Sequence, residues 1–279
     1  MDGLFAYDRG NQLDDELTII RHPRMSMFDT VKRLGLATNC KLILDAGDKA
    51  SYSGSGQVWS DISGQGNNFN LGASNAANTD DPTFSGSPGI RGSNYFSSDG
   101  GDFFRMAVAT PAWMQNLHKD GALATYLMWG YAPTTGALVA FGDGSTTFAN
   151  IGVLVGLGSG GSMTYLVNRA NAGAAGILAT GPAFTRNVWG LYSFSINENG
   201  GATASFMGIN NSYSTFDAAV TSPSASNASF TPEVMAGGNG VSIAGNGSRV
   251  GSIALWEGVA LSQANVTDIF NYTRGRYGV

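Results

Sequence analysis

Short apolar runs separated by turn residues dominate the chain from Cys40 onward. Seven of these runs read as β-strands, and they are 124–131, 138–141, 151–155, 164–167, 188–196, 204–209 and 250–256. In the fifth run, Val188, Tyr192, Phe194 and Ile196 recur on one face, which is the period-two alternation of a half-buried strand. Asn-Gly pairs at 199–200, 239–240 and 246–247 are hairpin-turn signals. Many short strands joined by tight turns predict an all-β, two-sheet antiparallel sandwich.

Helical periodicity occurs near both ends of the sequence. Near the C-terminus, Ser262 is a candidate N-cap, and an apolar stripe of Val266, Ile269 and Phe270 follows it. Near the N-terminus, a short helix is predicted between the N-cap Ser26 and Gly35. About ten residues do not hold a helix alone in water, so the N-terminal helix must pack on something.

Charge divides the chain near residue 38. Residues 1–38 hold 11 of the 35 charged residues, whereas charged residues are 13% of the whole chain. This boundary predicts an N-terminal arm over 1–38 and one folded domain over 39–279. The apolar residues proposed to attach the arm to a neighbouring subunit or partner are Phe5, Tyr7, Phe28, Val31 and Leu34. The alternative is that the short helix packs on its own domain.

Overall charge and composition exclude several classes of protein. The net charge of −5 and the pI near 4.9 argue against nucleic-acid binding, which favours a basic face. No apolar run reaches the roughly 18 residues of a membrane span. The N-terminus has no apolar signal-peptide region, so synthesis in a cytoplasm is expected. One cysteine, Cys40, permits no internal disulfide and is expected to be a buried, inert thiol.

Two segments carry a family resemblance. Residues 42–104 contain LILDAGDKASYSGSGQVWSDISGQGNNFNLG, then DDPTF and SSDGGDFF, and the chain closes with GSRVGSIALWEGVALSQANVTDIFNYTRGRYGV. This order resembles the concanavalin A-like lectin/glucanase superfamily, in the laminin-G-like jelly-roll form found in bacteriophage virion structural proteins. The resemblance covers roughly residues 40–279. Within it, Trp59 is expected in the core, beside a turn in which Asp61 and Ser63 satisfy backbone amides.

The resemblance implies a jelly-roll sandwich of two antiparallel sheets with a short C-terminal helix and an N-terminal extension. It also implies a non-enzymatic virion protein: a head decoration, a head fibre or a tail-associated part. Such a protein is made in the host cytoplasm and then located on the virion. Its partners are other capsid or tail proteins, and a homo-oligomer is expected because virions are symmetric.

The carboxylates do not form the pattern of a catalytic site. Glucanases of the superfamily carry Glu-x-Asp-x-x-Glu on one strand, and none of Glu16, Glu198, Glu233 and Glu257 lies in such a motif. We therefore assign no catalytic residues, and a glycan hydrolase is the least favoured function. No cofactor is expected. Calcium is the candidate metal, with Asp99, Asp102 and Asp143 as oxygen donors, although ordinary Asp-Gly turns are the favoured interpretation.

Exposed aromatic residues are the candidates for glycan binding, because an aromatic ring can stack on a sugar. The candidates, which lie in loop-like contexts, are Tyr52, Tyr95, Trp113 and Tyr213. The other tryptophans, Trp59, Trp129, Trp189 and Trp256, lie in or beside strands and are expected in the core. His118 is expected to be solvated. The alternative function is therefore a carbohydrate-binding module that recognises a host surface glycan.

Overall fold

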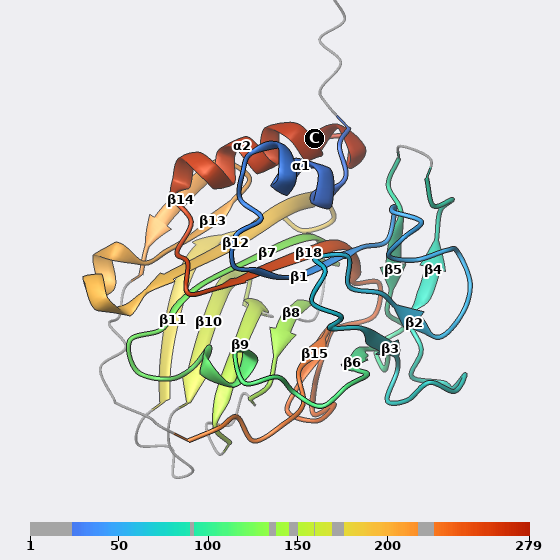
Figure 1. The fold of residues 1–279 in the computed structure, drawn as a ribbon, viewed down its shortest axis with the longest axis horizontal. Helices are drawn as coiled ribbons and strands as arrows, with labels where there is room; N and C mark the ends of the chain where they lie inside the picture. The colour runs from blue at the N-terminus through green and yellow to red at the C-terminus, as the bar shows by residue number, and fades with distance from the viewer. Residues whose placement is uncertain are drawn as a thin grey trace, which may run out of the picture.

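The chain folds as two antiparallel β-sheets that face one another, with helices on the outer face of one sheet (Figure 1). The computed structural model describes residues 24–89, 92–133, 138–144, 150–158, 160–168, 176–216 and 226–279, with the backbone alone at 139–140, 176–179 and 202. The predicted all-β sandwich is confirmed. Phe5 and Tyr7 lie outside the described residues, so their proposed role in attachment stays a prediction.

The helix-covered sheet has eight strands within the described residues. In spatial order they are β14 (Ser212–Thr215), β13 (Phe206–Ile209), β12 (Trp189–Asn197), β7 (Leu123–Tyr131), β18 (Arg249–Glu257), β5 (Tyr95–Ser97) and β4 (Thr83–Ser85), with β1 (Cys40–Asp45) also paired to β18. The longest strands, β7, β12 and β18, lie side by side at the centre. Residues far apart in the sequence therefore share one rigid surface.

The second sheet also has eight strands in the part of the chain that the structure describes. Their order is β11 (Gly176–Ala183), β10 (Ser162–Asn168), β9 (Gly152–Leu157), β8 (Leu138–Gly142), β15 (Glu233–Val234), β6 (Phe104–Met106), β3 (Phe69–Leu71) and β2 (Val58–Trp59). A small hairpin adds β16 (Ala236–Gly237) and β17 (Ser242–Ile243). Single 3₁₀ turns span Met114–Asn116, Glu198–Gly200, Ala202–Ala204 and Arg274–Arg276.

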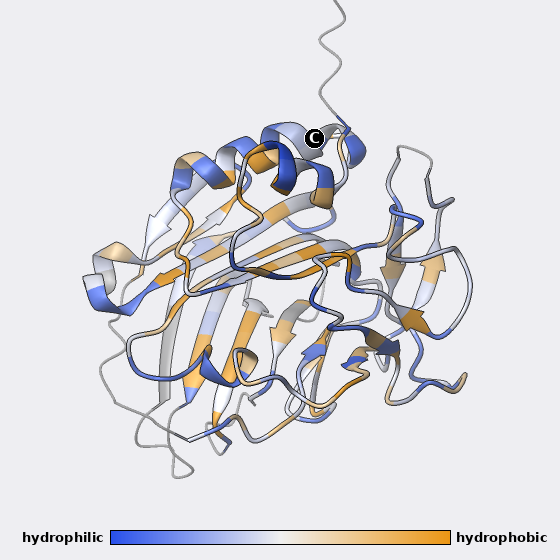
Figure 2. Cartoon of the chain, in the orientation of Figure 1, coloured by the Kyte–Doolittle hydropathy of each residue, from blue (hydrophilic) through white to orange (hydrophobic). Residues whose placement is uncertain are grey.

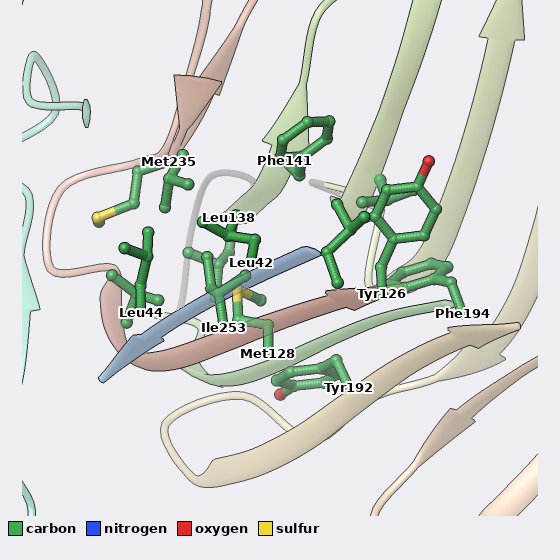
Figure 3. Packing of buried hydrophobic residues seen from close by; sticks show 14 of the residues in the cluster. Leu42, Leu44, Tyr126, Met128, Leu138, Phe141, Tyr192, Phe194, Met235 and Ile253 are labelled. Carbon is green, nitrogen blue, oxygen red and sulfur yellow. The ribbon is translucent and has the colours of Figure 1, made fainter. Parts of the chain in front are cut away.

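The main core fills the space between the sheets (Figure 3). Tyr126 and Met128 of β7 and Tyr192 and Phe194 of β12 point into it and are buried. The alternation predicted for β12 is confirmed for Tyr192, Phe194 and Ile196. Val188 precedes the strand and is 43% exposed, so its predicted place on the inward face is wrong.

A second apolar cluster lies on the other face of the helix-covered sheet. Leu127 and Trp129 of β7 and Leu191 of β12 alternate with the core residues and point outward, yet they are buried. The helices α1 (Met27–Arg33) and α2 (Gln263–Thr273) cover them (Figure 1). Hydrophobic residues recur along these central strands (Figure 2), and they belong to the main core on one face and to the second cluster on the other. Since both faces of this sheet are covered, its central strands are apolar on both sides.

The N-terminal helix packs on its own domain. Ser26 caps it by accepting a hydrogen bond from the Asp29 amide at 3.1 Å, as the sequence predicts. Met27 and Val31 are fully buried against the helix-covered sheet, and Phe28 and Leu34 are partly buried on the same cluster. Val31 is therefore not available to a partner, which corrects its proposed role in attachment, while Phe28 and Leu34 keep part of their surface.

The C-terminal helix forms where the sequence predicts it. Ser262 and Asn265 form a capping box, and Val266, Ile269 and Phe270 are buried. After α2, Arg276 turns back into the protein and forms a two-point ion pair with Asp45 at the end of β1, at 2.6 and 2.7 Å. Across the described residues, no helix is both long enough and apolar enough to cross a membrane.

The predicted turn around Trp59 is also confirmed. Trp59 is fully buried, and Asp61 Oδ1 accepts hydrogen bonds from the amides of Ile43 and Ser63 at 2.9 and 2.8 Å. Cys40 is buried, as expected, and burial raises the pKa of its thiol to about 12. The thiol is therefore protonated and unreactive at neutral pH.

Candidate functional site

Tyr52 is not a surface residue. Its side chain belongs to the main core and is 5% exposed, and its ring lies 4.9 Å from Phe84 and 4.8 Å from Phe96 between centroids. The hydroxyl donates to the Gly56 carbonyl at 3.2 Å. The prediction that this ring stacks on a sugar is therefore wrong. The residues next to Tyr52 in the sequence are typical of a loop, but side chains from distant segments bury its ring.

Trp113 and Tyr213 are half-buried at separate places. Trp113 packs against the main core beside the 3₁₀ turn Met114–Asn116. Tyr213 on β14 lies within hydrogen-bonding distance (2.8 Å) of Thr267 on α2, and its ring meets Phe206 edge-on. Tyr95 is on β5, five strand positions away from β14 in the same sheet. The predicted glycan-binding residues therefore do not converge on one site.

Tyr95 instead takes part in an aromatic group that the sequence did not predict. Its ring centroid lies 5.6 Å from Trp189, which lies 5.9 Å from Tyr131. The Arg249 guanidinium carbon lies 4.9 Å from the Tyr95 centroid and 4.4 Å from the Tyr131 centroid. We call Tyr95, Tyr131, Trp189 and Arg249 the Trp189 cluster. Each of its members is half-buried, so part of each side chain is open to solvent.

Strand register assembles the Trp189 cluster. Trp189 is the first residue of β12 and is paired with Tyr131 at the end of β7, which is in turn paired with Arg249 at the start of β18. Directly opposed residues on neighbouring strands lie close enough for their side chains to interact. Tyr277 packs against the cluster. Its ring centroid lies 4.9 Å from that of Trp189 and 4.3 Å from that of the buried Trp129.

A groove of about 240 Å³ opens beside Trp189. Apolar and polar side chains line it together, among them Pro182, Thr185, Val188, Asn210 and Ser212. The Asn210 side chain is held in place, because its Oδ1 accepts a hydrogen bond from the Leu191 amide at 2.9 Å. An aromatic ring beside hydroxyl and amide groups on a rigid sheet end is suited to a small polar ligand with an apolar face. We call this the Trp189 groove.

The period-two alternation of β12 could have predicted that Trp189 does not point into the main core. Tyr192, Phe194 and Ile196 face inward, so Trp189 must lie on the opposite face of β12. Trp189 is also the first residue of β12, so it lies at the end of the strand, where the neighbouring strand β7 ends as well and covers less of its side chain. Trp59, Trp129 and Trp256 are fully buried as predicted, and Trp189 is the exception among these four.

The candidate calcium ligands form turns. The Asp99 amide donates to Asp102 Oδ2 at 2.9 Å, and the Gly101 amide donates to Asp99 Oδ1 at 3.0 Å. Burial and the neighbouring Asp99 raise the pKa of Asp102 to about 6. Asp143 is fully buried at another place, where its Oδ1 accepts from the Val153 amide at 2.7 Å. Among the described residues, no three acidic, His or Cys side chains are placed to hold a metal, so these aspartates do not fit a calcium site.

Two other polar residues are buried and structural. His118 is fully buried, with Nε2 2.7 Å from the Ser226 carbonyl, so the prediction of a solvated histidine is wrong. Glu233 forms an ion pair with Arg105 at 2.7 Å and accepts a hydrogen bond from the Gly240 amide. Both groups hold segments of chain together, because an unpaired buried polar group would be costly.

No protein-family model matches the sequence, and no curated protein matches it. Solved structures do match the fold. The binding domain of botulinum neurotoxin DC in complex with SialylT has a TM-score of 0.59 and 10% identity, over 85% of this chain and 52% of that one. A structure of botulinum neurotoxin type C, whose cell entry depends on interaction with two ganglioside molecules, has a TM-score of 0.55 and 10% identity, over 86% of this chain and 52% of that one. Trypanosoma rangeli sialidase with the inhibitor DANA gives 0.51 and 13% over 88% and 37%.

These likenesses extend over most of this chain but over a smaller part of the others. The chain spans between 37% and 52% of the length of these three solved structures, so it corresponds to one part of each. At identities of 10 to 13%, these likenesses show that the fold is shared, and they do not show a shared activity. The chain therefore has the fold of a lectin-like jelly-roll β-sandwich.

Proposed function

We propose that the protein is a non-enzymatic carbohydrate-binding module and that a sugar ring stacks on Trp189 in the Trp189 groove. The observation that carries this proposal is the half-buried Trp189, which lines one groove together with Thr185, Asn210 and Ser212. Solved proteins with the same fold support it, because one of them was solved in complex with SialylT and another depends on interaction with two ganglioside molecules for cell entry.

The size of the groove favours a short segment of glycan. Its volume of about 240 Å³ lies below the roughly 300–1,000 Å³ of pockets that enclose drug-sized ligands. One sugar ring would fill it, and further rings would extend over the Trp189 cluster. The apolar face of the ring would lie on Trp189, and its hydroxyls would reach Asn210 and Ser212.

The lining of the groove favours binding over hydrolysis. Among the described residues that line it, none is Asp or Glu. Glycoside hydrolysis generally requires two carboxylates on either side of the bond that breaks. Glu233, which is buried, is occupied by Arg105 instead.

The glycan proposal is tested with Trp189→Ala and the matched control Trp113→Ala. A glycan array followed by calorimetry, with and without calcium, would first identify a ligand of the unaltered protein. Trp189→Ala should then weaken binding about tenfold or more, since loss of a central aromatic contact costs about 2 kcal/mol or more. Trp113→Ala, which alters another half-buried tryptophan, should bind normally. If no glycan binds, or if both variants bind equally well, the proposal fails.

A second proposal is that this module is a structural part of a bacteriophage virion, as a head decoration, head fibre or tail-associated protein. The supporting observation is the sequence resemblance at residues 42–104 and 247–279, together with the low proportion of charged residues. Phe28 of α1 and Leu34, the C-cap of α1, support an attachment surface, because part of each side chain is exposed to solvent. A homo-oligomer on a symmetric particle would follow.

The virion proposal is tested by cosedimentation with particles assembled in the same cells. A double change, Phe28→Ser with Leu34→Ser, should release the protein from particles while its fold persists, since Met27 and Val31 still anchor α1. Thr215→Ala, a change at an exposed residue of the edge strand β14, is the control. A protein that never sediments with heads or tails would refute the virion role.

A further inference from the structure

A larger groove, of about 810 Å³, lies beside α1 and away from the Trp189 groove. Its walls come from four separate segments: residues 24–33, the loop after β1, the loop at Gly89 and the 3₁₀ turn after α2. The charged side chains that line it include Arg24, Lys32, Arg33 and Lys49, with Arg276 among them. We call it the basic groove.

Basic residues are concentrated in this groove, although the whole chain has more acidic than basic residues. The groove gathers five of the 15 Lys and Arg residues but two of the 20 Asp and Glu residues, Asp29 and Asp48, in a chain of net charge −5. Asp45 neutralises Arg276, and three of the other cations, Lys32, Arg33 and Lys49, share the groove with two carboxylates. A concave surface of one sign concentrates ions of the opposite sign.

Two of the cations lie against glycines. Arg276 is fixed by both oxygens of Asp45, and a side chain on Gly47 would collide with its guanidinium. Lys49 is exposed, and its aliphatic stem lies along Gly89. A ligand would therefore meet one charge, that of Arg276, already positioned by the fold.

Two of the three remaining cations lie over aromatic rings. Lys32 Nζ is 5.0 Å from the Phe28 centroid, and the Arg33 guanidinium carbon is 5.2 Å from the Tyr272 centroid. Neither of them, nor Lys49, forms an ion pair with a carboxylate of the described residues. Lys32 and Arg33 also lie in the last turn of α1, where positive charge stabilises the helix by interacting with the negative end of its dipole. That role does not account for Lys49, which comes from another segment, or for Arg24, which precedes the helix.

We propose that the basic groove binds the anionic groups, carboxylate or phosphate, of an acidic saccharide. The inference rests on the proposed glycan-binding function and names the class of glycan. The two grooves are linked through consecutive residues, because Arg276 lines the basic groove and Tyr277 packs 4.9 Å from Trp189. A saccharide that combines neutral and acidic rings would engage both grooves and gain affinity from each.

The test compares oligogalacturonate with its fully methyl-esterified form, which has the same rings without charge. The full chain should bind the charged form at least tenfold more tightly, and this preference should shrink as salt is added. Lys32→Gln with Lys49→Gln should abolish the preference. The matched control, Lys41→Gln with Lys119→Gln, removes the same charge outside the groove and should keep it. If both double variants keep or lose the preference equally, the inference is overturned.

Inorganic phosphate separates this inference from the glycan proposal. Phosphate should shift the amide NMR signals around Lys32 and Lys49 in the unaltered protein and in the control, but not in the groove variant. If phosphate binds there while no saccharide binds at all, the anion site stands and the glycan function fails. If phosphate shifts the same signals in the groove variant, or shifts none in any variant, the anion site is refuted. Binding of the neutral ester that depends on Trp189 would then still support the glycan proposal.

Discussion

Arg276 shows how much of this fold depends on one buried charge. Its guanidinium is almost fully enclosed and makes two short contacts with Asp45, which is itself buried. Removing one partner of such a pair leaves an unpaired buried charge, which typically costs about 3–5 kcal/mol. We expect Arg276→Gln to lower the free energy of unfolding by that amount, measured by urea denaturation. Lys41→Gln should change it by less than about 0.5 kcal/mol. Equal stability of both variants would contradict the role of the pair.

Asp143 should make stability depend on pH. Burial raises its pKa in the folded protein from 3.8 to about 7, so the folded state keeps a proton that the unfolded chain has lost. The stability that this group contributes is full below about pH 4 and is lost as pH rises toward 7. A shift of this size corresponds to a loss on the order of 4 kcal/mol. Asp143→Asn, which cannot ionise, should lose less stability than the unaltered protein between pH 4.5 and pH 8, measured by urea midpoints. Parallel pH profiles would refute the assignment.

Individual residues were the least predictable part of the molecule. Tyr52 and His118 have polar neighbours in the sequence, yet both are buried, because distant segments cover them. Trp189 is surrounded by strand residues, yet it is half-exposed, because its place at the end of β12 leaves one side uncovered. Exposure depends on contacts between segments far apart in the chain, which local sequence does not specify.

At the scale of elements, α1 is a short helix that exists through its contacts. Seven residues are too few for a stable helix in water, so packing of Met27 and Val31 must hold it. Met27→Ala should cost about 2–5 kcal/mol, as other large-to-small changes in cores do. Leu34→Ala, at a partly exposed position of the same segment, should cost clearly less. Thermal unfolding followed by circular dichroism would compare the two, and equal losses would argue against this packing.

Elements were much more predictable than single residues. The seven predicted strands correspond to β7, β8, β9, β10, β12, β13 and β18, because each alternates or carries a strong apolar run. The capping residues Ser26 and Ser262 located both helices. The predicted list omits the other strands of the described residues, among them β14, whose residues Ser212–Thr215 are largely exposed and polar. An edge strand with little burial leaves no hydrophobic pattern to detect.

At the scale of the whole molecule, the N-terminal boundary at residue 38 has a measurable consequence. A chain that begins at Thr38 would lose α1 and expose the part of the helix-covered sheet that Met27 and Val31 now cover. We expect this shortened chain to be markedly less stable than the full chain and to bind more of a dye specific for exposed apolar surface. A chain that begins at Arg24 keeps α1 and is the matched comparison, which should unfold at a higher midpoint than the chain that begins at Thr38. Equal stability of all three chains would show that α1 is dispensable.

The pairing of β1 with β18 determines when this protein can finish folding. Cys40–Asp45 has its strand partner in Arg249–Glu257, and Asp45 has its ionic partner at Arg276, more than 200 residues later. While the ribosome is still making the chain, the first strand emerges long before either partner exists. The sandwich therefore closes only after β18 and Arg276 have been made, and until then the growing chain must keep an apolar strand from aggregating.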